Sequence, residues 1–219
     1  MTIPPQRPPR GREAEAARND RRVLDAAREV FARQGADAPV SAIAAQAGVG
    51  IGSLYRRYGS KRELLQQLCL LAMEQSIAAA REGLAADDPW HGLSDYVQAC
   101  VAFGAGALGA LAGAIETTPR MRATSRRSRR LLAELVRRAH AARVLRPDVS
   151  PLDVAYLIER LGRRGAEPDD AEQENVRDRV VAIALAGLRA HAGSPPLPGR
   201  PPSERRYTGR WSTPAAGGS

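Results

Sequence analysis

The chain has 219 residues with only nine aromatic side chains; at this length it buries roughly 70% of its unfolded surface, and a core of Ala, Leu and Val favours packed helices over strands. Two cysteines, Cys69 and Cys100, are too few for a disulfide framework or a cysteine-rich zinc site. The net charge of +9 indicates a polyanionic partner, with nucleic acid the first candidate.

Both ends of the chain are predicted to lack a fixed fold. The first residues are charged and have no apolar stretch of the kind a secretory signal needs, so we expect a cytoplasmic protein with reduced thiols. Residues 1–17 form a basic arm, which either reaches into a minor groove of DNA or remains a solvated tail. Residues 193–219 are rich in proline and poor in apolar side chains, which predicts a disordered tail.

Between the ends, apolar residues recur at helical spacing throughout. A first helix is predicted to end at Gly35, and two short helices follow at 40–47 and 50–58, with Gly48 between them. Longer helices are expected from near Ser60, from Pro89, and at about 121–144, 151–163 and 173–190. Because no alternating strand pattern is present, the predicted fold class is all-α.

Residues 39–58 have the pattern of a helix-turn-helix. Ile43 and Ala47 supply the inner face of the first helix, Gly48 permits a turn at positive φ, and Leu54 anchors the second helix. Such a second helix can enter the major groove of DNA with its early residues near base edges. The residues expected on its exposed side are Gly50, Ile51, Gly52, Ser53, Tyr55, Arg56 and Arg57.

The same segment resembles the DNA-binding domain of TetR-family repressors, in particular members with a GVGIGTLYR recognition helix. The resemblance rests on the run IAAQAGVGIGSLY at 43–55 and on the residues that follow it, namely Tyr58, Ser60, Lys61 and Leu64. The sequence departs from the usual family pattern at Pro39, Ala42, Tyr58 and Gly59.

The resemblance implies a three-helix DNA-binding domain at 18–76 and a helical effector-binding and dimerisation domain at 77–192. It assigns base-edge and phosphate contacts to Ser53, Tyr55 and Lys61. Ser41, which partly replaces the helix cap lost at Pro39, is also expected to bind DNA. It also implies a ligand-responsive repressor, in which a small-molecule effector shifts the helix after Lys61 and lowers the affinity for operator DNA. An arginine pair such as Arg56–Arg57, taken alone, is more typical of a solvated face.

Residues 99–115 are seventeen consecutive uncharged residues, at the lower limit for a membrane span. No basic cluster flanks them closely, so we expect no membrane partner. The run also contains the dinucleotide fingerprint Gly104-x-Gly106-x-x-Gly109, which makes an NAD(P)-binding enzyme the alternative function. That motif requires a preceding strand and a later acidic residue, yet 117–133 contains no acid. A buried helix, with no cofactor and no enzymatic activity, is the expected structure.

The small side chains of this run leave room for a cavity between helices. In the family that the chain resembles, the second domain holds the effector, and we hypothesise an apolar pocket there. Its predicted lining is Met73, Tyr96, Cys100, Phe103, Ala107, Leu111 and Tyr156. Each of these is otherwise an ordinary core residue.

A second basic block, residues 120–146, contains ten arginines and one glutamate. It predicts an amphipathic helix whose arginine face is either solvated or binds an anionic effector. His91, His140 and His191 lie far apart in the sequence and show no ligand spacing, so no metal site is expected. We also find no pairing of a nucleophile with a base.

One helix-turn-helix reads few base pairs, so we expect a homodimer on a palindromic operator. The last two predicted helices carry apolar faces that would pack as a four-helix bundle across a two-fold axis, with intrachain core as the alternative. The expected interface residues are Leu152, Ala155, Ile158, Leu161, Val176, Val180, Ile183, Ala184, Gly187 and Leu188.

Overall fold

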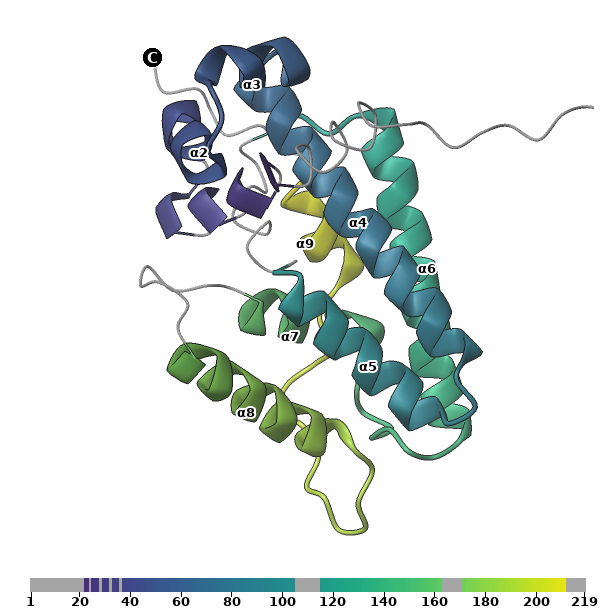
Figure 1. Ribbon diagram of the computed structural model, residues 1–219. Helices are drawn as coiled ribbons and strands as arrows, with labels where there is room; N and C mark the ends of the chain where they lie inside the picture. The colour runs from purple at the N-terminus through teal and green to yellow at the C-terminus, as the bar shows by residue number, and fades with distance from the viewer. Residues whose placement is uncertain are drawn as a thin grey trace, which may run out of the picture.

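The computed structural model describes residues 22–104 except 24, 28, 32 and 36, together with 115–162 and 171–211. Within these ranges the protein is helical, with no strand and one isolated antiparallel bridge (Figure 1). The described residues of 22–34 are helical, and the helices after them are α2 (Val40–Ala47), α3 (Ile51–Tyr58), α4 (Lys61–Ala85), α5 (Pro89–Ala102), α6 (Pro119–Ala141), α7 (Pro151–Leu161), α8 (Ala171–Leu188) and α9 (Glu204–Gly209). The all-α prediction is confirmed.

Side-chain caps explain where several helices begin. Ser60 accepts a hydrogen bond from the Glu63 amide at the start of α4, at 3.2 Å. Thr118 does the same for α6, and Ser150 forms a reciprocal capping box at the start of α7. These oxygens satisfy amides that have no partner within their own helix, which is why the sequence marks the boundaries well.

Helix α4 runs continuously through residue 76, where the sequence suggested a domain boundary, and it belongs to two hydrophobic clusters. Leu64 and Leu68 pack with α2, α3 and the described residues of 22–34, whereas Ala80 packs with α5 to α8. Farther along, α4 lies against both α5 and α6 (Figure 1). One rigid helix therefore connects the helix-turn-helix to the second helical bundle.

The C-terminal segment differs from the disordered tail expected for 193–219. Residues 193–211 are described and include α9, whose Tyr207 packs edge-on against Tyr156 with ring centroids 5.2 Å apart. Arg210 also donates to both carboxylate oxygens of Glu159 at 2.8 Å. A few strong contacts hold a segment whose composition alone predicts disorder. The predicted arm 1–17 and residues 212–219 lie outside the described residues.

Most of the uncharged run at 99–115 also lies outside the described residues, including Gly106 and Gly109. The segment that precedes Gly104 is helix α5, whereas a dinucleotide fingerprint requires a strand there. None of the helices in the described ranges combines the length and the apolar character needed to cross a membrane.

Candidate nucleic-acid interface

The turn between α2 and α3 has the geometry that its sequence predicts. Gly48 adopts φ 66° and ψ 35°, the left-handed conformation that favours glycine, and its amide donates to the carbonyls that end α2. The Val49 amide donates to the Ala44 carbonyl at 3.0 Å. Ile43 in α2 and Leu54 in α3 are buried, so the two helices meet through apolar side chains. The short turn and this packing fix the orientation of α3.

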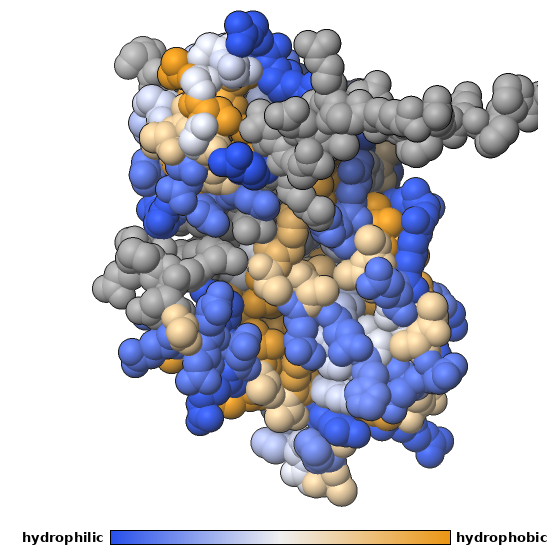
Figure 2. Space-filling view, viewed as in Figure 1, coloured by the Kyte–Doolittle hydropathy of each residue, from blue (hydrophilic) through white to orange (hydrophobic). Residues whose placement is uncertain are grey.

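Helix α3 buries Leu54 alone among its eight residues. Ile51 and Tyr55, four residues apart, are 46% and 47% exposed, although large apolar side chains are usually covered. Arg56 donates to the Ser53 hydroxyl at 3.0 Å, which holds a basic and a polar group together beside them. The end of the molecule that carries α3 in Figure 1 shows blue hydrophilic groups with apolar groups among them in Figure 2.

The predicted DNA-contacting residues belong to the exposed surface of α2, α3 and the start of α4. Lys61 is partly buried, and the exposed residues are Ser41, Gly50, Ile51, Gly52, Ser53, Tyr55, Arg56 and Arg57. Lys61 is the first residue of α4, where unpaired amides and the helix dipole favour an anion such as a DNA phosphate. The surface therefore combines side chains suited to base edges with groups suited to the backbone.

The joint between α3 and α4 is conformationally fixed. Gly59 has φ 70°, and a Cβ built there would lie 2.6 Å from a carboxylate oxygen of Glu63. The positive φ is the reason for glycine here, because the flexible Glu63 side chain could move away from an added Cβ. Because Ser60 caps α4 in the next position, Lys61 has a defined place relative to α3.

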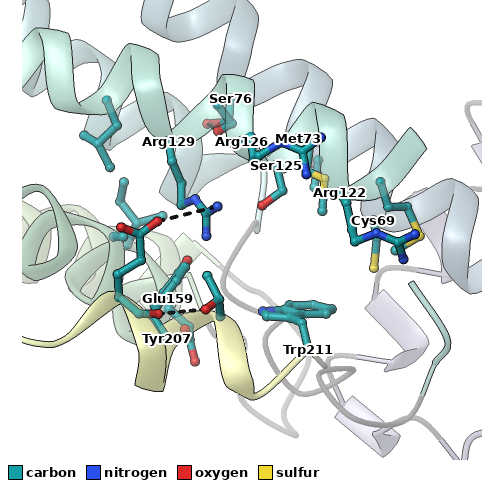
Figure 3. A pocket seen from close by; sticks show the side chains of 18 of the residues that line it. Cys69, Met73, Ser76, Arg122, Ser125, Arg126, Arg129, Glu159, Tyr207 and Trp211 are labelled. Atoms are coloured by element: carbon teal, nitrogen blue, oxygen red, sulfur yellow. Dashed lines mark hydrogen bonds and ion pairs between the residues drawn. The ribbon is translucent and has the colours of Figure 1, made fainter. Parts of the chain in front are cut away.

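A cavity of about 610 Å³ lies between α4, α6 and α9, and no residue of the helix-turn-helix lines it (Figure 3). Three of the predicted pocket residues, Met73, Tyr96 and Cys100, line it. Ser76 connects two walls, since its hydroxyl lies 3.0 Å from the Tyr96 hydroxyl and 2.9 Å from that of Ser128. Side chains from α4, α5 and α6 thus share one hydrogen-bonded patch inside the cavity.

The other predicted pocket residues are placed differently. Phe103 packs against the cluster that includes the helix-turn-helix, and Tyr156 contacts Tyr207 beside the cavity. Ala107 and Leu111 lie outside the described residues. Three of the seven predicted residues therefore line this cavity, and its remaining walls come from segments that the prediction did not include.

The two cysteine side chains line this cavity as neutral thiols. Burial raises the pKa of the Cys69 thiol to about 12 and that of Cys100 to about 11. The thiolate is the reactive form of cysteine, so these groups serve as small apolar surface.

Sequence reasoning missed the wall that α9 contributes, which is formed by Glu204, Arg205, Tyr207, Thr208 and Trp211. Tyr207 and Trp211 are four residues apart and follow the helix cap at Ser203 in the sequence. This spacing would have indicated a short helix with one aromatic face. Trp211 also packs against the cluster that contains the core of the helix-turn-helix. The segment thus contacts both halves of the molecule.

The predicted dimer residues fall into three groups by exposure. Ile158 and Leu188 are buried within the protomer, which makes them part of its core and leaves them unavailable to a partner. Val176, Val180 and Ile183 are 48%, 42% and 68% exposed, and together with exposed Gly187 they form a stripe along α8. Less exposed positions are Leu152, Ala155, Leu161 and Ala184.

Comparisons with known proteins agree with this architecture. A family model described as bacterial regulatory proteins, tetR family, matches residues 23–68, and one described as the C-terminal domain of SbtR-like transcriptional regulators matches 88–190. A search of curated protein sequences finds no significant match.

Solved structures show the same fold. A TetR transcription regulatory protein from Mycobacterium vanbaalenii is 29% identical, with a TM-score of 0.55, over 81% of this chain and 99% of that one. PfmR, a TetR family regulator from Thermus thermophilus, is 23% identical, with a TM-score of 0.56, over 77% and 100% of the two chains. Since two family models cover both helical parts and the helix-turn-helix has the expected geometry, the chain belongs to the TetR family of transcriptional regulators.

Proposed function

We propose that the protein is a ligand-responsive repressor that binds a palindromic operator as a homodimer. The observation that carries the DNA-binding part is the exposed surface of α3, where Ile51, Tyr55 and Arg56 extend from a helix that is anchored by buried Leu54 and partly buried Tyr58. Side chains in this position can reach base edges in the major groove, while Lys61 meets the backbone. In a repressor of this kind, effector binding favours a state with lower operator affinity.

The experiment selects duplexes from a random pool with the purified protein and then measures their binding by fluorescence anisotropy. Loss of a side chain at a base edge costs about 1–3 kcal/mol, so Tyr55→Ala should weaken binding to the selected duplex about tenfold or more. Lys61→Gln should weaken binding to all duplexes and lower the salt dependence, because it removes a phosphate contact. The control is Arg130→Gln, an exposed arginine on α6, which should change neither.

Failure to enrich any sequence, or equal binding by wild type and Tyr55→Ala, would contradict the assignment of α3 as the recognition helix. A selected sequence without two-fold symmetry would contradict the dimer.

We propose that α8 forms the dimer surface through the stripe of Val176, Val180, Ile183 and Gly187. These four exposed residues are apolar or small and lie on one face of the helix. Such a face is more typical of a surface that contacts a partner than of one that remains in solvent. Ile183→Glu should shift the protein toward monomer in sedimentation equilibrium. Ala182→Glu adds the same charge at an exposed neighbouring position off the stripe and should leave the dimer intact. A dimer that survives Ile183→Glu would exclude this surface.

We propose the cavity between α4, α6 and α9 as the effector site. It lies against α4, the helix that begins at Lys61 beside the recognition helix, so a ligand there contacts the element that positions the DNA-binding surface. The NAD(P)-binding alternative finds no support in this arrangement, because α5 occupies the place of the required strand.

A further inference from the structure

The walls of the cavity differ in chemical character. Ala72 and Met73 of α4 and Met121 and Leu132 of α6 all line the cavity. These four side chains are apolar and uncharged. They suit the apolar body of a ligand.

The solvent side of α6 contributes a row of arginines to the same cavity. Arg122, Arg126 and Arg129 all line it, and their spacing of four and three residues places them on one helical face (Figure 3). Arg205 adds a fourth guanidinium from α9. Positive charge is therefore concentrated along one side of an otherwise largely apolar space.

Nearby carboxylates do not balance this charge. Glu159 already accepts two hydrogen bonds from Arg210 at 2.8 Å, and Glu204 lies 3.7 Å from Arg129. Arg122 donates to the Thr117 carbonyl at 2.5 Å, which is a neutral acceptor. Of the four arginines that line the cavity, Arg129 alone thus has a carboxylate partner in the described structure.

Arg126 is the best placed of these groups to receive an anion. It has no hydrogen bond or ion pair within the described residues, and it is exposed, so an anion reaches it without crossing the core. A guanidinium presents parallel N–H groups that match a carboxylate or sulfonate, and such charge-assisted bonds are among the strong ones.

We propose that the cavity binds an organic anion with an apolar body, whose acid group meets Arg126 and whose body lies against Met73 and Leu132. This inference rests on the proposed effector site and adds the chemical class of its ligand. The segment that closes the cavity, which includes Tyr207 and Trp211, lies beyond residues 88–190 matched by the C-terminal family model. Part of the site therefore belongs to a portion of this chain that the family model does not cover.

The test uses two fluorescent dyes that share one scaffold. 8-Anilinonaphthalene-1-sulfonate carries a sulfonate, and N-phenyl-1-naphthylamine is its neutral counterpart. Each is titrated into the full-length protein and into Arg126→Gln. Removing one charge-assisted bond should raise the Kd of the sulfonate about tenfold, and the Kd of the neutral dye should stay within about twofold.

Arg127→Gln is the matched control, because Arg127 is the exposed neighbour on the same helix and does not line the cavity. It should leave both dissociation constants unchanged. Glutamine has a helix propensity close to that of arginine, so neither variant should alter folding, which thermal unfolding checks.

The outcomes distinguish the effector site itself from the chemical class of its ligand. If both dyes bind at one per protomer and Arg126→Gln changes neither, the effector cavity stands and the anionic class is overturned. Equal losses for Arg126→Gln and Arg127→Gln would also overturn it, since they would indicate general surface charge. If neither dye binds, the effector site itself is refuted, while DNA binding by α3 is tested separately by duplex selection.

Discussion

The crossing of α4 and α5 gives a sharp prediction for stability. Gly83 and Gly92 face each other there, and a Cβ built on Gly92 would lie 2.1 Å from the Gly83 carbonyl oxygen. A Cβ on Gly83 would lie 2.3 Å from the Gly92 carbonyl oxygen. Because backbone lies on both sides, rotation of a side chain cannot relieve the overlap. We therefore expect Gly92→Ala to force the two helices apart.

Two effects of opposite sign determine the magnitude. Alanine is favoured over glycine in a helix by about 1 kcal/mol. Overpacking costs about 1–3 kcal/mol, and a contact of 2.1 Å must widen by about 1 Å before it becomes tolerable, so we take the upper part of that range. The net loss in the free energy of unfolding should be about 1–2 kcal/mol. In a protein of this size that corresponds to about 2–8 °C in Tm.

Urea and thermal unfolding measure this loss, with Gly52→Ala as the control. Gly52 lies in α3, outside the proposed dimer surface, and has no atom within 4 Å of a built Cβ, so the same substitution should raise the free energy of unfolding by up to about 1 kcal/mol. All proteins are compared at one concentration, because the proposed dimerisation would contribute to stability. If Gly92→Ala is as stable as the wild type while Gly52→Ala is stabilised, the backbone contact does not constrain the crossing.

Three further predictions concern the cavity and the joint. Arg210→Ala removes two hydrogen bonds to the α7 carboxylate, so α9 should detach and Trp211 emission should shift to the red in a Trp90→Phe background; an unchanged spectrum would refute this attachment. Burial raises the pKa of Cys69 to about 12 in the folded protein, so above pH 9 the thiol ionises in the unfolded chain first. The free energy of unfolding is therefore unaffected by this group below pH 9 and falls as the pH rises toward 12. Cys69 and Cys100 should each lose about 1 kcal/mol between pH 8 and 10 in urea unfolding, and Cys69→Val should remove about half of the total loss. Ser60→Ala removes the α4 cap and should cost about 1 kcal/mol in the same assay; no loss would show that the cap contributes nothing.

Features determined by local chemistry could be predicted from the sequence. The turn at Gly48 depends on one residue that tolerates positive φ, and the start of α4 depends on a hydroxyl at Ser60. Both signals act within four residues of the feature that they determine. The helix boundaries and the exposed surface of α3 follow from signals of this kind.

Features that depend on distant contacts could not be predicted in the same way. Tyr207 and Arg210 are held by α7, about fifty residues earlier in the chain, while their own surroundings are proline-rich and polar. The composition of a segment indicates how much apolar surface it could bury. It does not show that a distant helix provides the nearly buried carboxylate of Glu159 as a partner for Arg210. The same reasoning explains Ile158 and Leu188, whose apolar faces are equally suited to a dimer and to the core of the protomer.

The geometry of α4 suggests how a ligand in the cavity could affect DNA binding. The backbones of α4 and α5 approach too closely at Gly83 and Gly92 for a Cβ on either residue, so this crossing is the natural pivot. At 1.5 Å per residue, Met73 lies about 15 Å from that pivot and Lys61 about 33 Å. A rigid tilt that moves Met73 by a given distance therefore moves Lys61 by about twice as much. In a symmetric dimer both recognition helices would move, so a ligand displacing Met73 by about 1 Å would change their separation by up to about 4 Å, enough to disturb their fit to two half-sites one DNA turn apart.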